Sequence, residues 1–456
     1  MIRKIHQYWL NQHSRLIMTV SDDGGDQNVR YLDTVVQKNP NLIEFAAELH
    51  QQNLVPVNTF VMDLDAHVHN AKSMITEAHR FGIKLYYMSK QIARNPIITQ
   101  AILNTGFEGV VTVEPQELTS LLRYGIRIGH VGHLVNIPQH EIDYVLKVAR
   151  PEVITVFNVE KAKMISNSAQ RLGITQKLLI RPINSQDTVY PYMEGGFEEN
   201  DAIAAIEKIN TFPNVKVEGV TSFPCLLYDL KFKRPSYMPN IDTLNRVAEK
   251  ARNLGITLPQ INTPPFCITK TIEYYAKKGS THCEPGLGMT GMAPWHCYAP
   301  EIHPEIPGAV YVTEVSHMYN EYAYAYAGGF GYIEIFELAY DGKSYVPDIS
   351  KLRMKALVGS TPDKLMNNPV DAEHYHGILD YHARLYKNSS LKVGDTVVYG
   401  YRAQMFVTRS QLAVVSGLKD NNPKLLGIFD HANNLIDRHG HLLGEQKTID
   451  LIKQHA

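Results

Sequence analysis

The stretch TFVMDLDAHVHNAKSMITEAHRFGIKLYYMS, residues 59–89, sets the pattern that decides the fold class. A short apolar run is followed by an amphipathic segment that ends on Gly82, and a second apolar run occupies 84–89. Glycine is common just past the end of a helix, so the middle segment is predicted to be helical. Strand, helix and strand in steady alternation indicate parallel βαβ units.

The same alternation continues far beyond this stretch. With the run at 59–64 set aside, eight strands are predicted, at 84–89, 109–113, 126–132, 153–157, 177–183, 215–223, 258–262 and 280–285. A (β/α)8 barrel typically takes ~250 residues, which matches this span. We therefore predict an α/β fold with a TIM barrel over 58–297, and leave open that 58–64 joins the β domain that follows.

The remaining parts of the chain follow other patterns. After residue 298 the apolar residues alternate as in strands, with turn signals such as Asp341-Gly342 and Gly394-Asp395. We predict a mainly antiparallel β domain over 298–456. Residues 1–57 are mixed or helical in character and form an N-terminal extension.

Composition excludes several classes of protein. The 456 residues hold 45 Lys and Arg against 46 Asp and Glu, a net charge of −1, whereas a general nucleic-acid binder carries a basic excess. The four cysteines form no C-x-x-C pair, so neither a disulfide scaffold nor a zinc ribbon is expected. No apolar stretch suits a signal peptide or a membrane helix. We expect a cytoplasmic protein with no membrane partner.

Lys90 and two glycine segments carry the chemistry that the pattern suggests. Lys90 directly follows the first barrel strand, where TIM barrels place catalytic groups, and a partly desolvated lysine can form a Schiff base. Position alone also allows a solvated loop lysine. Gly195-Gly196 and Gly286-Leu287-Gly288 follow the fifth and eighth strands, where backbone N–H groups can hold a phosphate. Turns need glycine too, so each segment is weak on its own.

Several blocks together carry a family resemblance. They run in order along 58–420 and read VMDLDAHVHNAK (61–72), MSKQIARNP (88–96), GHLVNIP (132–138), TSFPCLLYD (221–229), CEPGLGMTG (283–291) and YRAQMFVTRS (401–410). The chain resembles the alanine-racemase-type, fold type III enzymes that use pyridoxal 5'-phosphate (PLP), and more closely the YhfX-like group of amino-acid racemases. The resemblance implies a PLP-bearing barrel, a small-molecule amino-acid substrate, and a homodimer with shared active sites.

The resemblance also implies roles for individual residues. Lys90 matches the lysine that carries the cofactor, and Arg94 falls where the racemases have a phosphate-binding tyrosine. A guanidinium suits a phosphate dianion. Asn262-Thr263 resembles a pair near the phosphate, and Gly286-Leu287 resembles the phosphate-binding pair after strand eight. Gly195, Gly196 and His133 are expected to line the cofactor as well.

Two positions depart from the racemase pattern. Glu284 stands where alanine racemases have an arginine at the pyridine nitrogen, and a carboxylate there would keep that nitrogen protonated, as in fold III decarboxylases. A protonated ring is the stronger electron sink, so decarboxylation and aldol cleavage become alternatives. Ser222 stands where the family often has a histidine stacked on the ring.

Racemisation needs a base on each face of the planar carbanion. Lys90 would serve one face, and the resemblance places a tyrosine of the β domain, matched by Tyr326, on the other. In EYAYAYAGG (321–329) alternate tyrosines share one face if the segment is a strand, although that face could also pack on the core. Tyr324 and Arg402 are candidates for contact with the substrate.

The histidine pairs suggest no metal site. Three pairs have close spacing, but no third ligand follows at a suitable distance in sequence; they are His67 with His69, His130 with His133, and His439 with His441. The sequence therefore predicts a PLP-dependent amino-acid racemase or epimerase that abstracts the α-proton with two bases. A PLP-dependent decarboxylase or aldolase is one alternative, and a non-catalytic PLP-binding protein of cofactor homeostasis is another.

Overall fold

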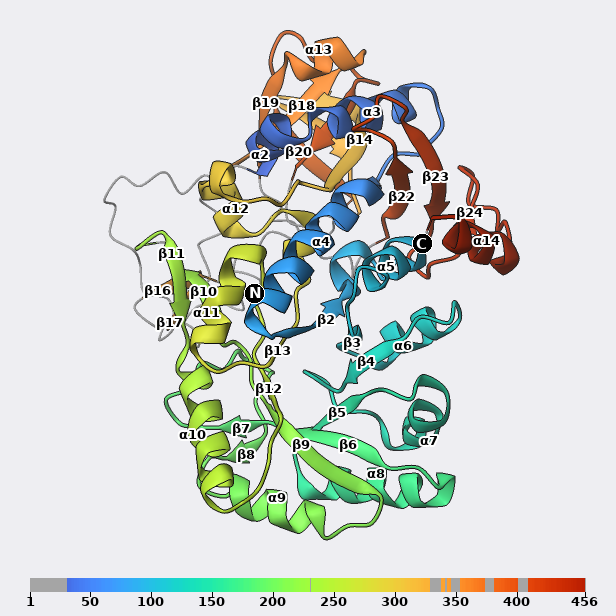
Figure 1. The fold of residues 1–456 in the computed structure, drawn as a ribbon. Helices are drawn as coiled ribbons and strands as arrows, with labels where there is room; N and C mark the ends of the chain where they lie inside the picture. Colours follow the sequence, from blue (N-terminus) through green and yellow to red (C-terminus); the bar gives the residue numbers. More distant parts are fainter. Residues whose placement is uncertain are drawn as a thin grey trace, which may run out of the picture.

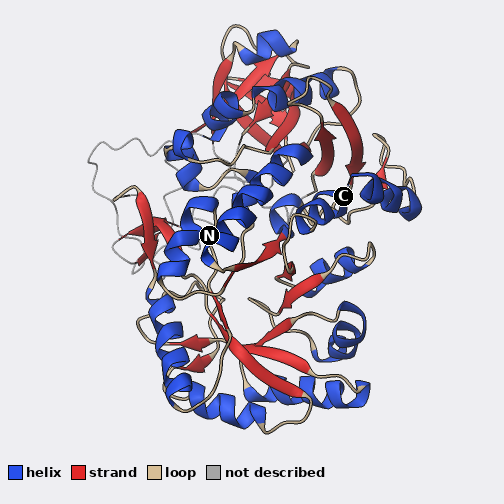
Figure 2. Cartoon of the chain, viewed as in Figure 1, coloured by secondary structure: helices blue, strands red, loops and turns tan. Residues whose placement is uncertain are grey.

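The computed structural model describes residues 31–229, 231–328, 338–340, 343–345, 353–373, 381–400 and 409–455. Figure 1 shows two bodies, a barrel with its surrounding helices and a large β-sheet above it. The helices lie on the outside of the barrel and at the outer face of the sheet (Figure 2).

The barrel is closed and all its strand pairs are parallel. Its strands, in order around the barrel from the first, are β2 (Lys84–Met88), β3 (Gly109–Thr112), β4 (Ile128–Val131), β5 (Val153–Val156), β6 (Gln176–Ile180), β9 (Val215–Thr221), β12 (Gln260–Asn262) and β13 (His282–Cys283). Seven lie inside their predicted runs and β6 begins one residue before its run at 177–183, so the predicted barrel is confirmed.

Helix α4 leads from β1 (Thr59–Asp63) into the first barrel strand, and the helices after it connect successive barrel strands. In chain order these helices are α4 (Leu64–Phe81), α5 (Pro96–Leu103), α6 (Pro115–Leu122), α7 (Ile142–Tyr144), α8 (Val159–Leu172), α9 (Ala202–Asn210), α10 (Pro239–Asn253) and α11 (Ile272–Lys277). Helix α4 begins where the Asp63 side chain accepts hydrogen bonds from the backbone N–H groups of Asp65 and Ala66, which caps the helix. It ends before Gly82, as the sequence predicts.

The second body is a mainly antiparallel sheet of ten strands, which confirms the predicted β domain. In order across the sheet they are β15 (Tyr322–Tyr326), β20 (His382–Tyr386), β19 (Pro369–Glu373), β18 (Arg353–Gly359), β21 (Thr396–Tyr399), β14 (Ala309–Tyr319), β1 (Thr59–Asp63), β22 (Gln411–Ser416), β23 (Lys424–Phe429) and β24 (Leu435–Ile436). Strand β1 pairs antiparallel with β14 and parallel with β22. The run at 59–64 therefore belongs to this sheet and leads directly into helix α4.

Smaller elements complete the described chain. Helices α2 (Tyr31–Lys38) and α3 (Pro40–Gln51) pack against the ten-stranded sheet, partly on β14 and β21. The other elements are α12 (Pro294–Tyr298), α13 (Pro362–Met366), α14 (Glu445–His455), a sheet of β11 (Arg234–Tyr237), β10 (Leu226–Asp229), β16 (Leu338–Tyr340) and β17 (Lys343–Tyr345), and the pair β7 (Pro182–Ile183) and β8 (Phe197–Glu198). Among the helices described, none combines the length and apolar character needed to cross a bilayer.

Candidate active site

The barrel interior has an apolar layer and, above it, a polar one. Tyr86, Met88, Val111, Val153 and Leu179 form one buried apolar cluster. Alternate residues of a strand share a face, so the next inward positions lie nearer the carboxyl ends of the strands. At or just after the ends of β4, β5, β6, β9, β12 and β13 the residue at this level is polar and buried: His130, Thr155, Arg181, Thr221, Asn262 and Glu284. TIM barrels carry their chemistry at this end.

Glu284 lies at the centre of a hydrogen-bond network within this layer. Its Oε1 accepts from Nδ1 of His130 and from Nδ2 of Asn262, each at 2.6 Å. The network extends on both sides, because His130 Nε2 lies 2.6 Å from Thr155 Oγ1 and Asn262 Nδ2 lies 3.1 Å from Thr221 Oγ1. Five barrel strands are thus joined through one carboxylate.

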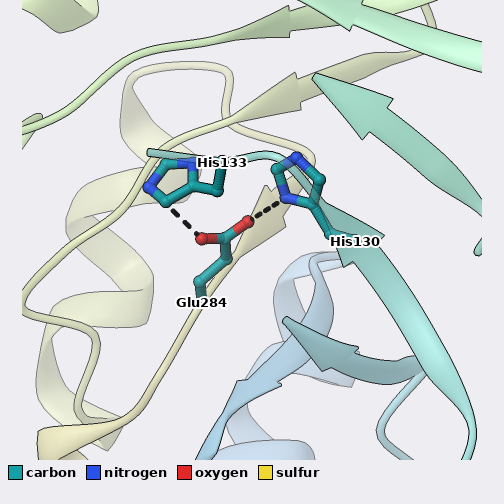
Figure 3. Close-up of side chains that lie close together, drawn as sticks. All are labelled: His130, His133 and Glu284. Carbon is teal, nitrogen blue, oxygen red and sulfur yellow. Dashed lines mark hydrogen bonds and ion pairs between the residues drawn. The ribbon is translucent and has the colours of Figure 1, made fainter. Parts of the chain in front are cut away.

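The same carboxylate faces a second histidine. His133 Nε2 lies 3.6 Å from Glu284 Oε2, and Figure 3 shows the carboxylate between the two imidazoles. Burial alone would raise the pKa of the Glu284 carboxyl, but the two histidines and the hydrogen bonds from His130 and Asn262 outweigh it and hold this pKa at about 2. Burial lowers the pKa of His133 to about 4. At neutral pH an ionised carboxylate therefore faces a neutral imidazole.

One half of the Glu284 carboxylate has no hydrogen bond. Oε2 and both ring nitrogens of His133 are buried without a hydrogen-bond partner. A buried polar atom left unpaired costs about 1–3 kcal/mol, so native proteins rarely retain one without a reason. An N–H group of a cationic heterocycle satisfies such an oxygen, and the protonated pyridine ring of PLP is such a group. The residues present therefore fit the cofactor that the sequence predicts.

Lys90 lies on a short 3₁₀ turn, η1 (Ser89–Ile92), directly after β2. Its side chain is half-buried, and its charge acts on His133 and on the buried Glu117. The turn packs against η5 (Leu287–Thr290). A Cβ on Gly286 would lie 2.5 Å from Gln91 Oε1 and 3.0 Å from Met88 Cβ, so the Gly286 backbone lies close against the end of β2 and the turn that follows it. Lys90 and the Gly286-Leu287 pair are therefore neighbours.

The other residues predicted near the phosphate are engaged within the protein. Arg94 lies on the Lys90 side of the barrel, and its Nη1 is 3.7 Å from Oε1 of the buried Glu117. The Thr263 hydroxyl donates to Ser280 Oγ at 2.8 Å, and Ser222 Oγ accepts from Asn240 at 3.1 Å. The side-chain amide of Asn262 donates a hydrogen bond to Glu284 Oε1. Their roles toward the cofactor remain predictions.

Gly195 and Gly196 lie over Arg181 at the end of β6. The N–H of Phe197, which follows them, donates to the Arg181 carbonyl at 2.8 Å, within the β7–β8 pair. Gly196 has φ +140, and a Cβ there would lie 2.3 Å from the Arg181 carbonyl oxygen. Its glycine is therefore required by the backbone geometry, whether or not the loop also contacts a cofactor.

Replacing Gly196 by alanine should lower the free energy of unfolding by about 1–3 kcal/mol, the cost of strained backbone, plus the cost of moving the Arg181 backbone away from the new Cβ. Urea unfolding measures this loss. The matched control is Gly255→Ala, because Gly255 also has a positive φ, +77, but no atom lies within 4 Å of its added Cβ. If the two variants lose equal amounts of unfolding free energy, the close approach of Gly196 to Arg181 does not contribute to the loss.

The predicted tyrosines lie on the sheet, away from its core. Tyr322, Tyr324 and Tyr326 share one face of β15, while Ala323 and Ala325 are buried on the other. The segment is thus a strand with alternating faces, and its tyrosines do not pack into the core. Tyr324 stacks on His317 with ring centroids 4.6 Å apart, and the Tyr326 side chain is 41% exposed. Arg402 lies outside the described residues.

Tertiary structure supplies a third residue for one histidine pair. Nitrogen and oxygen atoms suited to a metal lie within 4.8 Å of one another in two buried groups of the described chain: His130, His133 and Glu284, and His296, His303 and Glu305. In the second group His296 Nδ1 accepts the Ala293 N–H at 3.1 Å, so its proton lies on Nε2, facing Glu305 at 3.3 Å. The two side chains thus face each other at ion-pair distance without a hydrogen bond, and the absence of a metal remains a prediction.

Several of these residues were not predicted as part of a cofactor site. The sequence places His130 at a polar strand end and in a histidine pair, but not in a cofactor site, and it assigns no role to Thr155, Thr221 or Arg181. The one available signal was polarity at the inward positions near the strand ends, and Arg181 in KLLIRPI (177–183) carries it most clearly.

Comparisons with known families agree with this architecture. Residues 62–294 match the alanine racemase N-terminal domain, and residues 310–425 match the YhfX-like C-terminal domain. A protein of Escherichia coli strain K12, called uncharacterized protein YhfX, is 30% identical over 410 residues, which is 89% of this chain and 99% of that protein.

Solved structures share the fold at low identity. The D-threonine aldolase of Filomicrobium marinum has a TM-score of 0.60 at 14% identity, covering 82% of this chain and 95% of its own. The alanine racemase of Clostridium difficile 630, in complex with cycloserine, has a TM-score of 0.57 at 15% identity, covering 83% and 99%. The D-threo-3-hydroxyaspartate dehydratase of Delftia sp. HT23 has a TM-score of 0.55 at 13% identity, covering 82% and 97%. The barrel, the sheet and both domain matches together show that this chain belongs to the YhfX family, within the alanine racemase fold group.

Proposed function

We propose that this protein is a PLP-dependent enzyme that removes the α-proton of an amino acid, and that it racemises or epimerises its substrate. The observation that carries the proposal is the buried carboxylate of Glu284, whose Oε2 has no hydrogen bond, in a barrel whose first strand is followed by Lys90. The fold family consists of PLP-dependent enzymes, which supports this assignment of the cofactor.

Four residues or pairs would hold the cofactor. Glu284 would accept a hydrogen bond from the ring nitrogen, and Lys90 would bind the aldehyde carbon. Gly286-Leu287 and Arg94, which lie near the Lys90 turn, would face the phosphate. PLP, when bound, provides an electron sink for negative charge at the substrate α-carbon.

The protein's own groups would move the protons. For inversion the Lys90 amine would take the α-proton from one face of the substrate while a proton is given to the opposite face, and in the reverse direction it would give a proton to its own face. The phenol of Tyr326 would act on the other face. Its exposure on the outer side of β15 supports a role toward a second copy of the chain, so we propose a homodimer in which each barrel is completed by the partner's sheet.

Glu284 also favours a second candidate. A carboxylate that keeps the ring nitrogen protonated strengthens the electron sink, which suits decarboxylation or aldol cleavage at the α-carbon as well as racemisation. A D-threonine aldolase and a D-threo-3-hydroxyaspartate dehydratase share this fold. The reaction on the shared scaffold therefore needs a direct test.

The test uses the full chain loaded with PLP and a panel of D- and L-amino acids in heavy water. We expect α-proton exchange, followed by mass spectrometry, together with D/L interconversion on a chiral column. Loss of the carboxylate or release of an aldehyde without interconversion would assign a decarboxylase or an aldolase. A cofactor spectrum that no amino acid perturbs would instead favour a non-catalytic PLP-binding protein.

Replacing Glu284 by glutamine should slow α-proton exchange by ~10- to 100-fold, because a charge-assisted hydrogen bond contributes ~1.5–3 kcal/mol and 1.36 kcal/mol corresponds to tenfold in rate. The matched control is Glu305→Gln. Glu305 is also buried, accepts the Thr269 N–H at 2.7 Å and faces His296, but it lies outside the polar layer of the barrel. A slowdown of equal size in both variants would show that the effect comes from the stability of the fold.

A further inference from the structure

Arg181 is the one member of the polar barrel layer that the Glu284 network leaves out. The network joins the inward residues of β4, β5, β9, β12 and β13 by hydrogen bonds. Arg181 directly follows β6, between β5 and β9, and is 1% exposed. Its position two residues after Leu179, which lies in the apolar cluster, directs the side chain to the barrel interior.

The guanidinium retains unused donors. Both Nε and Nη1 are buried without a hydrogen-bond partner. A guanidinium has two edges, each of which can bind a carboxylate by two parallel hydrogen bonds, and Nε and Nη1 belong to different edges. Both edges of Arg181 therefore keep a donor that water does not reach.

Two carboxylates, those of Asp187 and Glu194, act on this charge electrostatically, but neither forms an ion pair with the guanidinium. The Asp187 oxygens accept hydrogen bonds from the Thr243 hydroxyl at 2.7 Å and the Asn184 N–H at 3.0 Å. The group on the guanidinium is the Phe157 ring, whose centroid lies 5.3 Å from Cζ. A buried cation without an ion pair is costly, so the site favours an anion supplied from outside the chain.

The barrel topology defines where that anion would lie. In the closed order of strands, β6 is four steps from β2 in either direction, so Arg181 lies across the barrel from the Lys90 turn. Its charge also acts on His133, which faces Glu284. Arg181 therefore belongs to the same chamber as the proposed cofactor residues, on the opposite wall from the lysine.

We propose that Arg181 is the carboxylate-binding residue of the substrate site, and that the substrate is an amino acid with a free carboxylate. This inference rests on the proposed function, because it requires a substrate attached near Lys90. The same guanidinium chemistry would also suit the phenolic oxygen of the cofactor, and the experiment separates these two sources of negative charge.

The first measurement needs no variant. Glycine and glycinamide both lack a side chain, but they differ in the negative charge and in the basicity of the amino group. Both are titrated into the PLP-loaded full chain while the visible cofactor spectrum is recorded, and each concentration is expressed as that of the unprotonated amine. We expect half-saturation by glycine at a concentration about 10- to 100-fold lower than by glycinamide, as for the gain of one charge-assisted hydrogen-bonded pair. Equal half-saturation would overturn the proposal.

The second measurement uses Arg181→Met and Arg181→Lys. We expect unchanged PLP content and an unchanged spectrum without amino acid, but loss of the preference for glycine in Arg181→Met and partial recovery of it in Arg181→Lys. The control is Arg246→Met, since Arg246 forms a bidentate pair with Glu199 at 2.8 Å on helix α10, outside the chamber.

The remaining outcomes each have one meaning. A changed spectrum or PLP content in Arg181→Met without amino acid would assign Arg181 to the cofactor's oxygen and overturn the proposal. If the wild type binds PLP and glycine, and Arg181→Met keeps the same preference for glycine over glycinamide, only this inference is refuted. A wild-type chain that takes up no PLP would refute the proposed function itself. If Arg181→Met does not fold, Arg181→Lys provides the comparison, in which an undiminished preference for glycine would overturn the proposal, as would equal half-saturation of the wild type by glycine and glycinamide.

Discussion

Replacing Lys90 by alanine should abolish the visible absorption band that borohydride removes from the PLP-loaded protein, and should slow α-proton exchange by ~10²–10⁴-fold, the usual contribution of a positioned acid or base. Lys90 lies at the carboxyl end of β2, half-buried on the turn that packs against Gly286 and η5. Alanine removes both the amine that binds the cofactor and the base on one face. Absorption spectra before and after borohydride, with exchange rates in heavy water, measure the two losses.

The matched control for this variant is Lys84→Ala. Lys84 begins the same strand, but it lies at the opposite end of the barrel, where its exposed ammonium is 3.5 Å from Glu108 Oε1. Surface ion pairs contribute ~0–1 kcal/mol, so the spectrum and exchange rate should be those of the wild type. A Lys90→Ala protein that keeps the borohydride-sensitive band would refute the assignment of the lysine.

Replacing Tyr326 by phenylalanine should lower D/L interconversion by ~10²–10⁴-fold while α-proton exchange from one enantiomer continues. The substitution removes only the hydroxyl group, and Lys90, the base on the opposite face, remains. Chiral chromatography and deuterium incorporation, measured on the same samples, separate interconversion from exchange. The control is Tyr319→Phe, a tyrosine at the end of β14 that is 65% exposed.

The shared active site can be tested by mixing two inactive variants. Tyr326→Phe chains keep Lys90, and Lys90→Ala chains keep Tyr326, so a mixed dimer contains one complete pair if the tyrosine comes from the partner. We expect interconversion to reappear when the two proteins are unfolded together and refolded. If both variants fold and their mixture still shows no D/L interconversion, the result would contradict a site shared between subunits.

Local patterns were enough to predict the barrel strands. Each strand is a short apolar run followed by a segment of helical periodicity, and both signals depend only on neighbours in the sequence. Polar residues after those runs marked the chemical end of the barrel, which is how Lys90 and Glu284 were found. The run at 59–64 could not be assigned in this way, because a buried strand has the same pattern in a barrel and in a sheet.

The interactions around Glu284 depend on closure of the barrel. His130 and Glu284 are 154 residues apart, and their hydrogen bond exists because β13 closes onto β2, two strands from β4. No spacing rule connects such residues, so a third partner for the pair His130 and His133 could not be predicted. The same reason applies to Arg181, whose lack of a partner is visible only when all surrounding side chains are placed.

The sequence by itself determined the parallel barrel, the β domain and the position of Lys90, because periodicity and strand-end polarity are local properties of the chain. Only the tertiary structure decided that one oxygen of Glu284 is buried without a hydrogen bond, that two donor nitrogens of Arg181 are buried without one, and that Tyr326 lies on an outer face. Burial and hydrogen bonding depend on groups that lie far apart in the sequence. These surroundings, together with residue type, control the charge and reactivity of a side chain.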